Sequence, residues 1–183
     1  GEELAITRTL ARLGIPILRT LSGSALMEGG SFAWINERTA VIGCGIRVNR
    51  EGAEQVGEVL KRQGVELLII DLFGYDLHID GSFQMIGKDL AIVDPFGLPY
   101  SFLQKLKELK VQTVEISPAD DRWIINSLAV APGELLMPEG ASNQTLDALA
   151  KHGVSWTVIP YGKMQLNGGG IHCSTTPLIR DPV

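Results

Sequence analysis

An internal repeat constrains the fold of this chain more than any other feature of its sequence. Four segments share one pattern, in which an amphipathic helix is followed by a short breaker and then by a run rich in β-branched residues. The predicted helix–strand pairs cover residues 2–13 and 15–21, 51–63 and 65–72, 99–109 and 111–116, and 144–152 and 154–159. They recur about every 43 to 50 residues, a period typical of propellers and other repeat folds.

Three predicted β-hairpins lie between these pairs. Residues 30–42 align with residues 81–93, and residues 126–137 align with the second of these segments. In each, two apolar runs flank a polar turn. The repeating unit is therefore strand–strand–helix–strand, and because such a unit cannot bury its sheet alone, its copies must pack around a shared core. We expect an α/β propeller that forms a single, partial domain over residues 1–183.

The count of units predicts a ring that is incomplete at its N-terminus. Besides three whole units, the chain has the helix–strand pair at 2–21, with no hairpin before it, and one terminal strand. A closed ring needs more strands, so we expect an N-terminal part that is missing, cleaved or supplied by another chain. The expected protein partner is accordingly a second copy in a homo-oligomer or a complementing N-terminal segment.

Composition and charge exclude several classes of partner. The net charge is −5 and no cluster of Lys and Arg is present, which argues against binding to nucleic acid. No run approaches the ~20 apolar residues of a membrane span, and no secretory signal pattern opens the chain. Two cysteines are too few for a disulfide framework, so we expect a reduced, cytoplasmic protein. Three histidines and two cysteines show no zinc spacing, so no metal site is expected.

The segment from Asn167 to Arg180 contains the strongest candidate for chemistry. Its glycine run, residues 168–170, reaches backbone conformations closed to other residues and lets a ligand approach the main chain, which makes Gly169 a candidate for substrate binding. The run leads to Cys173, at the start of an apolar, Thr-rich stretch that predicts a short strand. A thiol there can act as a nucleophile if a base and an orienting carboxylate lie elsewhere in the sequence.

His78 and Asp80 are candidates for the base and for a cation-binding acid. If residues 77–85 form a strand, both side chains project from one face. A histidine beside a carboxylate can shuttle protons while the acid binds a cation, although a strand-end pair that only solvates a loop has the same pattern. The repeat aligns Glu28 within one position of His78, and equivalent positions converge on a propeller axis. We therefore expect four side chains to meet: Glu28, His78, Asp80 and Cys173.

Other candidates have simpler alternatives. Arg47 precedes a predicted helix and could hold a substrate carboxylate, or it could be an exposed turn residue. Asn126 could present its amide to the same centre or cap a turn. Cys44, in an apolar strand, is expected to be inert. His172 should point to the opposite face of the predicted strand from Cys173, so we do not assign it as the base.

These segments together resemble the guanidine-modifying (pentein) superfamily, which includes arginine deiminases, dimethylarginine dimethylaminohydrolases, agmatine deiminases and glycine amidinotransferases. The resemblance covers essentially the whole chain and is carried by five motifs: Glu28-Gly-Gly, Gly45-Ile-Arg-Val-Asn49, Leu77-His-Ile-Asp-Gly-Ser-Phe83, Arg122-Trp-Ile-Ile-Asn-Ser127 and Gly168-Gly-Gly-Ile-His-Cys173. It implies a five-bladed propeller with its site on the axis. The chain begins after the place of the Arg-Asp motif of the family's first blade, and its motifs are divided between subfamilies.

The resemblance also implies a role for each candidate residue. Cys173 would be the nucleophile and His78 the acid/base, while Glu28 would orient the imidazole and bind the guanidinium. Asp80 would be a second guanidinium carboxylate, and Arg47 would bind a substrate carboxylate. The residue types suit this chemistry, because a planar guanidinium matches paired carboxylates and a nearby cation favours a thiolate.

We therefore expect a cysteine-dependent enzyme that modifies a small guanidino compound through a covalent amidino-thioether. Water would complete a hydrolase cycle and an amine a transferase cycle, with hydrolysis favoured and without a cofactor. Two alternatives stay open. One is a catalytically incomplete propeller fragment that binds a ligand or partner, and the other is a thiol hydrolase for some other amide or amidine.

Overall fold

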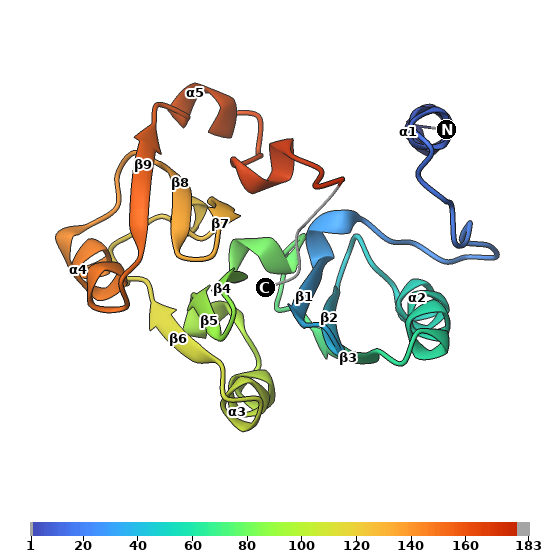
Figure 1. The fold of residues 1–183 in the computed structure, drawn as a ribbon, viewed down its shortest axis with the longest axis horizontal. Coiled ribbons are helices and arrows are strands. Elements are labelled where there is room, and N and C mark those ends of the chain that lie inside the picture. Colours follow the sequence, from blue (N-terminus) through green and yellow to red (C-terminus); the bar gives the residue numbers. More distant parts are fainter. Residues whose placement is uncertain (1, 179–183) are drawn as a thin grey trace.

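The computed structural model describes residues 2–178 and contains three small sheets around a common centre (Figure 1). The sheets have the strand orders β1-β2-β3, β4-β5-β6 and β7-β8-β9. In each sheet the first two strands are antiparallel and the second and third are parallel. The first strands, β1, β4 and β7, lie toward the centre, and one helix lies on the outer side of each sheet (Figure 1).

Each unit has the predicted order strand–strand–helix–strand. The first consists of β1 (Phe32–Asn36), β2 (Thr39–Cys44), α2 (Arg50–Arg62) and β3 (Glu66–Asp71). The second consists of β4 (Phe83–Gly87), β5 (Leu90–Val93), α3 (Tyr100–Glu108) and β6 (Gln112–Glu115). The third consists of β7 (Leu128–Ala131), β8 (Glu134–Pro138), α4 (Asn143–Lys151) and β9 (Ser155–Ile159). The repeat and its three hairpins are thus confirmed.

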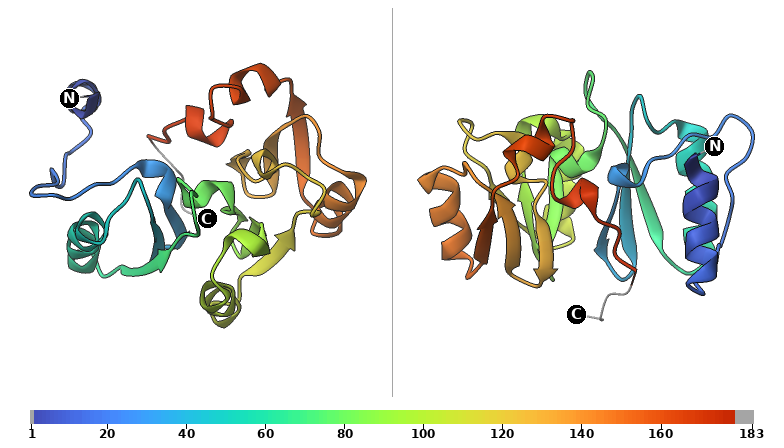
Figure 2. Two further views of the ribbon diagram at one scale, coloured as in Figure 1. Left: turned by 180° about the vertical axis from the view of Figure 1, so that it is seen from behind. Right: turned by 90° about the horizontal axis from the view of Figure 1, so that it is seen from above.

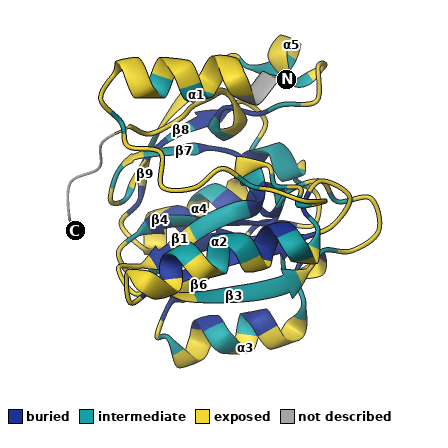
Figure 3. Ribbon diagram, turned by 90° about the vertical axis from the view of Figure 1, so that its right-hand side faces the viewer, coloured by how far each residue is buried: buried dark blue, intermediate teal, exposed yellow. Residues whose placement is uncertain are grey.

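Local signals account for these elements. Asn49 caps α2, because its side chain accepts a hydrogen bond from the backbone N–H of Gly52, and Lys61 and Arg62 complement the helix dipole in the last turn. Ala53 and Leu60 form the buried face of this helix. Figure 3 shows buried and exposed residues side by side along α2 and α3, whereas α1 is exposed over most of its length.

Neighbouring units share their cores. Ile35 and Val41 of the first unit pack in one cluster with Phe83 and Phe102 of the second. Ile86 of the second unit packs in another cluster with residues of the third. Each sheet therefore buries its apolar residues against the next, as expected of units that are not stable alone.

Two predicted strands are wrong. Helix α1 (Glu2–Arg12) is as predicted, but residues 15–21 have no regular secondary structure. A strand needs a hydrogen-bonding neighbour, and none of the strands in residues 2–178 pairs with this run. Helix α1 stands apart from the three units (Figures 1 and 2).

The predicted strand that begins at Cys173 is the second of these. Residues His172–Ser174 form a single 3₁₀ turn, η5, and no strand follows before residue 178. Ile179 and Arg180, the end of the stretch singled out from the sequence, lie outside the described residues. A short helix, α5 (Gly162–Gln165), precedes the glycine run. None of the helices in the described part of the chain is both long and apolar enough to cross a membrane.

Candidate active site

Two short 3₁₀ turns bring Glu28 and His78 together. Turn η1 (Gly29–Ser31) precedes β1 and turn η2 (Ile79–Gly81) precedes β4, and the two turns contact each other. Glu28 is the residue before η1 and His78 is the residue before η2, so they occupy equivalent places in adjacent units. The predicted strand over residues 77–85 is wrong in its first half, because β4 begins only at Phe83.

The carboxylate of Glu28 joins two basic side chains. His78 Nε2 lies 2.7 Å from Glu28 Oε2, and Arg47 Nη1 donates a 3.2 Å hydrogen bond to Glu28 Oε1. Gly30 lies beneath this group, since a Cβ there would be 2.8 Å from His78 Nδ1 and 3.2 Å from Asp80 Oδ2. The close approach of both side chains requires a glycine at this position.

The thiol of Cys173 is held by Asn126 and Asp80. Asn126, which is only 1% exposed, donates from Nδ2 to Cys173 Sγ at 3.1 Å and accepts from the backbone N–H of Cys173 at 3.2 Å. The thiol in turn donates to Asp80 Oδ2 at 3.4 Å. Asp80 is 5% exposed, so its carboxylate lies in a region of low polarity beside the sulfur.

These surroundings raise the pKa of Cys173. The largest cause is partial burial of the thiol, although the residue as a whole is exposed, and the second is the negative charge of Asp80. Hydrogen bonds from Gly170 and Asn126 act in the opposite direction. In the unliganded site the thiol is therefore predominantly protonated at neutral pH. A cation bound beside Asp80 would offset its charge and favour the thiolate.

The structure brings most of the predicted residues into one region, with two differences of detail. In residues 2–178 no hydrogen bond joins Cys173 to His78, and the two are linked through Asp80, Gly30 and the turns that carry them. Gly169 is not a point of tight approach, because the nearest atom to a Cβ there would be Cys173 Cβ at 3.8 Å. Arg47 forms an ion pair with Glu28.

Sequence reasoning missed His172. Its Nδ1 lies 3.0 Å from Asp80 Oδ2, so Asp80 contacts both the imidazole of His172 and the thiol of Cys173. We excluded this histidine because alternate residues of a strand face opposite sides, but a 3₁₀ turn has no such alternation. The glycine run immediately before it is the signal that could have indicated a turn.

Gly170, rather than Gly169, is the position at which a side chain should impair the site. A Cβ at Gly170 would lie 2.2 Å from Asn126 Oδ1, so Gly170→Ala must displace the amide that holds Cys173. We expect the turnover proposed below to fall about 10- to 100-fold, as displacements near 1 Å do in enzymes. Gly169→Ala is the matched control and should change the rate less than about threefold. Equal effects of the two variants in initial-rate assays would contradict this expectation.

No family model matches the chain. An uncharacterized protein of Aeropyrum pernix is 27% identical over 178 residues, covering 97% of this chain and 62% of that protein. An arginine deiminase of Oenococcus oeni is 23% identical over 212 residues, covering 94% of this chain and 51% of that protein. The chain therefore spans between half and two thirds of the length of these relatives.

Several solved structures resemble this chain in fold despite low sequence identity. The dimethylarginine dimethylaminohydrolase of Pseudomonas aeruginosa, a cysteine-to-serine mutant complexed with citrulline, has a TM-score of 0.77 and 19% identity over 94% of this chain and 64% of its own. The N-terminal domain of ArgZ, covalently bound to a reaction intermediate, has a TM-score of 0.81 and 18% identity over 94% of this chain and 64% of its own.

A third similar structure is SxtG, an amidinotransferase from Microseira wollei, with a TM-score of 0.72 and 17% identity over 84% of this chain and 48% of its own. The predicted fold class, an α/β propeller built from strand–strand–helix–strand units, is confirmed by these likenesses.

Proposed function

We propose that this chain, which has the fold of the guanidine-modifying (pentein) superfamily and resembles that superfamily in sequence, modifies a small guanidino compound by covalent catalysis at Cys173. One observation supports this proposal above all others. Asp80, which contacts the thiol of Cys173, and His78, which contacts Glu28, both lie against Gly30, although these residues come from segments far apart in the sequence. An ordinary core has no use for such a group of titratable side chains.

The acids of this site suit a guanidinium in shape and charge. The Glu28 carboxylate contacts His78 and the Asp80 carboxylate contacts Cys173, and a planar guanidinium bound at this site can donate to carboxylates of both residues. The contact between Arg47 and Glu28 supports this, because the side chain of Arg47 is itself a guanidinium. When the substrate replaces it on Glu28, the half-exposed Arg47 is free to hold a carboxylate at the other end of the substrate.

The proposed reaction begins when the bound cation offsets the charge of Asp80 and Cys173 loses its proton to solvent, from which the sulfur regains a proton at the end of the cycle. The thiolate attacks the central guanidino carbon and gives a tetrahedral adduct. His78, oriented by Glu28, donates a proton to the departing nitrogen as its bond to carbon breaks, leaving an amidino-thioether on Cys173. His78 then takes a proton from water or from an acceptor amine, which attacks the same carbon and releases the thiol.

We favour hydrolysis of an arginine-like compound over amidino transfer. The relatives support either outcome, because their names include an arginine deiminase, an arginine dihydrolase and an amidinotransferase. The open, exposed position of Cys173 gives water direct access to a thioether there. The paucity of cysteines favours a reducing, cytoplasmic setting, which would keep this thiol free.

A second candidate is a module that binds a guanidinium without turning it over. The lack of a hydrogen bond between Cys173 and His78 in the described structure favours it, because the acid must reach the adduct formed on sulfur. Binding would then use Glu28 and Asp80 alone.

Product analysis separates the two. The chain is incubated with L-arginine, N-methylated arginines and agmatine, ureido products and released amines are quantified, and acid-quenched protein is weighed by mass spectrometry. We expect turnover of at least one compound and an amidino mass increase at Cys173. Saturable binding of a guanidine without product or adduct would favour the binding module instead. A Cys44→Ser variant controls for labelling of the buried cysteine.

A further inference from the structure

We infer that Arg122 is a positioning residue that fixes the segment carrying His78 and Asp80; this inference rests on the proposed function. Arg122 begins the 3₁₀ turn η4 (Arg122–Ile124), which precedes β7 in the third unit. Its side chain contacts the loop that connects β3 of the first unit to β4 of the second unit. Arg122 itself takes no part in the chemistry described above, although Asn126 of the same motif holds the thiol.

The guanidinium of Arg122 contacts this loop on both sides of the two site residues. On the N-terminal side, Nη1 and Nη2 bind the Asp76 carboxylate at 2.6 and 3.2 Å as a bidentate pair. On the C-terminal side, Nε donates to the carbonyl of Gly81 at 3.2 Å and Nη2 donates to the hydroxyl of Ser82. Residues 77–80 are therefore clamped at both ends by one rigid, planar group.

The clamp is closely packed and stays charged. Asp94 lies 3.5 Å from Arg122 Nε and adds a second acid. The hydrogen bond to Asp76 is the largest cause of a further rise in the pKa of Arg122. A Cβ at Gly97 would lie 2.2 Å from Ser82 Oγ and 3.2 Å from Arg122 Nη2, so the backbone approaches too closely for any side chain.

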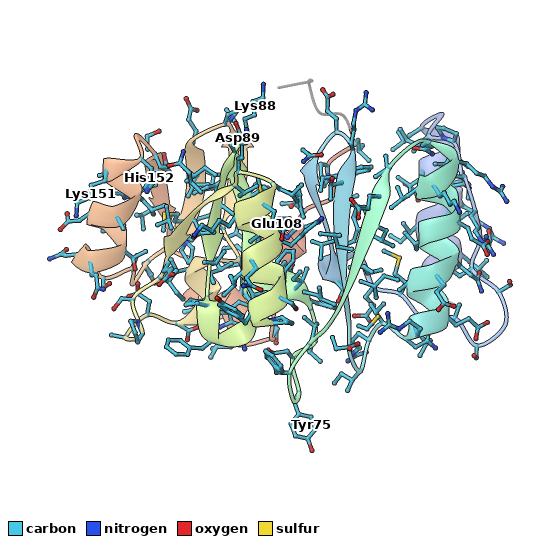
Figure 4. All side chains as sticks on the ribbon, turned by 90° about the horizontal axis from the view of Figure 1, so that it is seen from below. Tyr75, Lys88, Asp89, Glu108, Lys151 and His152 are labelled. Carbon is cyan, nitrogen blue, oxygen red and sulfur yellow. The ribbon has the colours of Figure 1, made fainter. Side chains whose placement is uncertain are left out.

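Besides the clamp, the hydroxyl of Ser31 donates a 3.3 Å hydrogen bond to the carbonyl of Leu77 in this loop. Between the end of β3 at Asp71 and the start of η2 at Ile79 it has no regular secondary structure. Tyr75, at the tip of this loop, is 92% exposed and projects away from the body of the molecule (Figure 4). The anchoring of Asp76, two residues before His78, is therefore one of the contacts that set the position of His78 relative to Glu28.

The short segment from Arg122 to Asn126 also holds the thiol of Cys173. Asn126, four residues after Arg122, bonds to Cys173 through its side chain and accepts from the backbone N–H of His172 at 3.0 Å. Because no hydrogen bond in the described structure joins Cys173 to His78, their relative position is set by what each is attached to. Residues 122–126 are attached to both, through Arg122 on one side and Asn126 on the other.

The test is a double-variant cycle on the full chain with the guanidine that it turns over. Arg122→Gln and Asp76→Asn should each lower kcat about 10- to 100-fold and change KM less than about threefold, because they misplace the acid without removing a substrate contact. The double variant should be no slower than the worse single variant, since both remove one interaction. Arg50→Gln is the control: it removes an exposed ion pair with Asp71 (3.3 Å) and should leave kcat within about twofold.

A second measurement does not depend on activity. The ¹⁵N chemical shifts of the His78 imidazole report its hydrogen bond to Glu28, and Arg122→Gln should displace them while Arg50→Gln should not. If the wild-type chain has no activity and Arg122→Gln still displaces the His78 shifts, the proposed function is rejected and the clamp is supported. Unchanged kcat together with unchanged His78 shifts in Arg122→Gln would overturn the inference. So would equal loss of kcat in the Arg50→Gln control.

Discussion

A Cys173→Ser variant is expected to lose turnover by about 10⁴-fold or more, the scale seen when a nucleophile is removed. A serine hydroxyl ionises far less readily than a thiol. The side chains that hydrogen-bond to Cys173 are Asn126 and Asp80, so His78 is not placed to take a proton from a serine at this position. The amidino adduct should disappear with the activity. Initial rates and intact-protein masses, measured side by side, test both expectations.

The buried cysteine provides the control for this variant. Cys44 ends strand β2 and packs in an apolar cluster with Ile42, Val48 and Ala53. Burial raises the pKa of Cys44, which makes it a poor nucleophile. Cys44→Ser should retain activity and the adduct. A Cys173→Ser chain with a rate near that of the unchanged chain would refute covalent catalysis at this residue.

Replacement of His78 by asparagine is expected to lower kcat about 10²- to 10⁴-fold, because general acid–base catalysis is lost while the guanidinium carboxylates remain. His78 is the imidazole paired with Glu28 at 2.7 Å. KM should change much less than kcat. Steady-state kinetics, with thermal unfolding to verify the fold, provide the measurement.

His172→Asn is the matched control for the His78 variant. Both histidines contact a carboxylate, but His172 contacts Asp80, which already touches the thiol, and has no link to Glu28. Replacement of His172 should lower kcat by about tenfold or less. If His172→Asn is slower than His78→Asn, the acid/base role belongs to the histidine adjacent to Cys173 instead.

The units of the fold could be predicted because their signals are local and repeated. Apolar residues at helical spacing, β-branched runs and polar turns recur three times, so each unit supports the interpretation of the others. The alignment of the hairpins also predicted the meeting of Glu28 with His78, since equivalent positions of adjacent units approach the same centre.

Local signals failed where a segment depends on a distant neighbour. The apolar run at 15–21 has strand composition but no pairing strand in the described chain. Residues 79–81 and 172–174 lie in segments predicted as strands, yet both form 3₁₀ turns, and His172 and Cys173 of the second turn contact Asp80 of the first. The expectation that His172 points away from Cys173 was wrong for this reason, whereas its exclusion as the base stays a prediction.

The sequence alone therefore determined the repeating unit and the fold class, and it predicted which thiol, imidazole and carboxylates lie near one another. Only the tertiary structure decided which atoms touch: the contact of Asp80 with both Cys173 and His172, the tight packing at Gly170, and the clamp formed by Arg122. Periodic patterns report which face of a segment is buried, whereas individual hydrogen bonds depend on how separate units pack against one another.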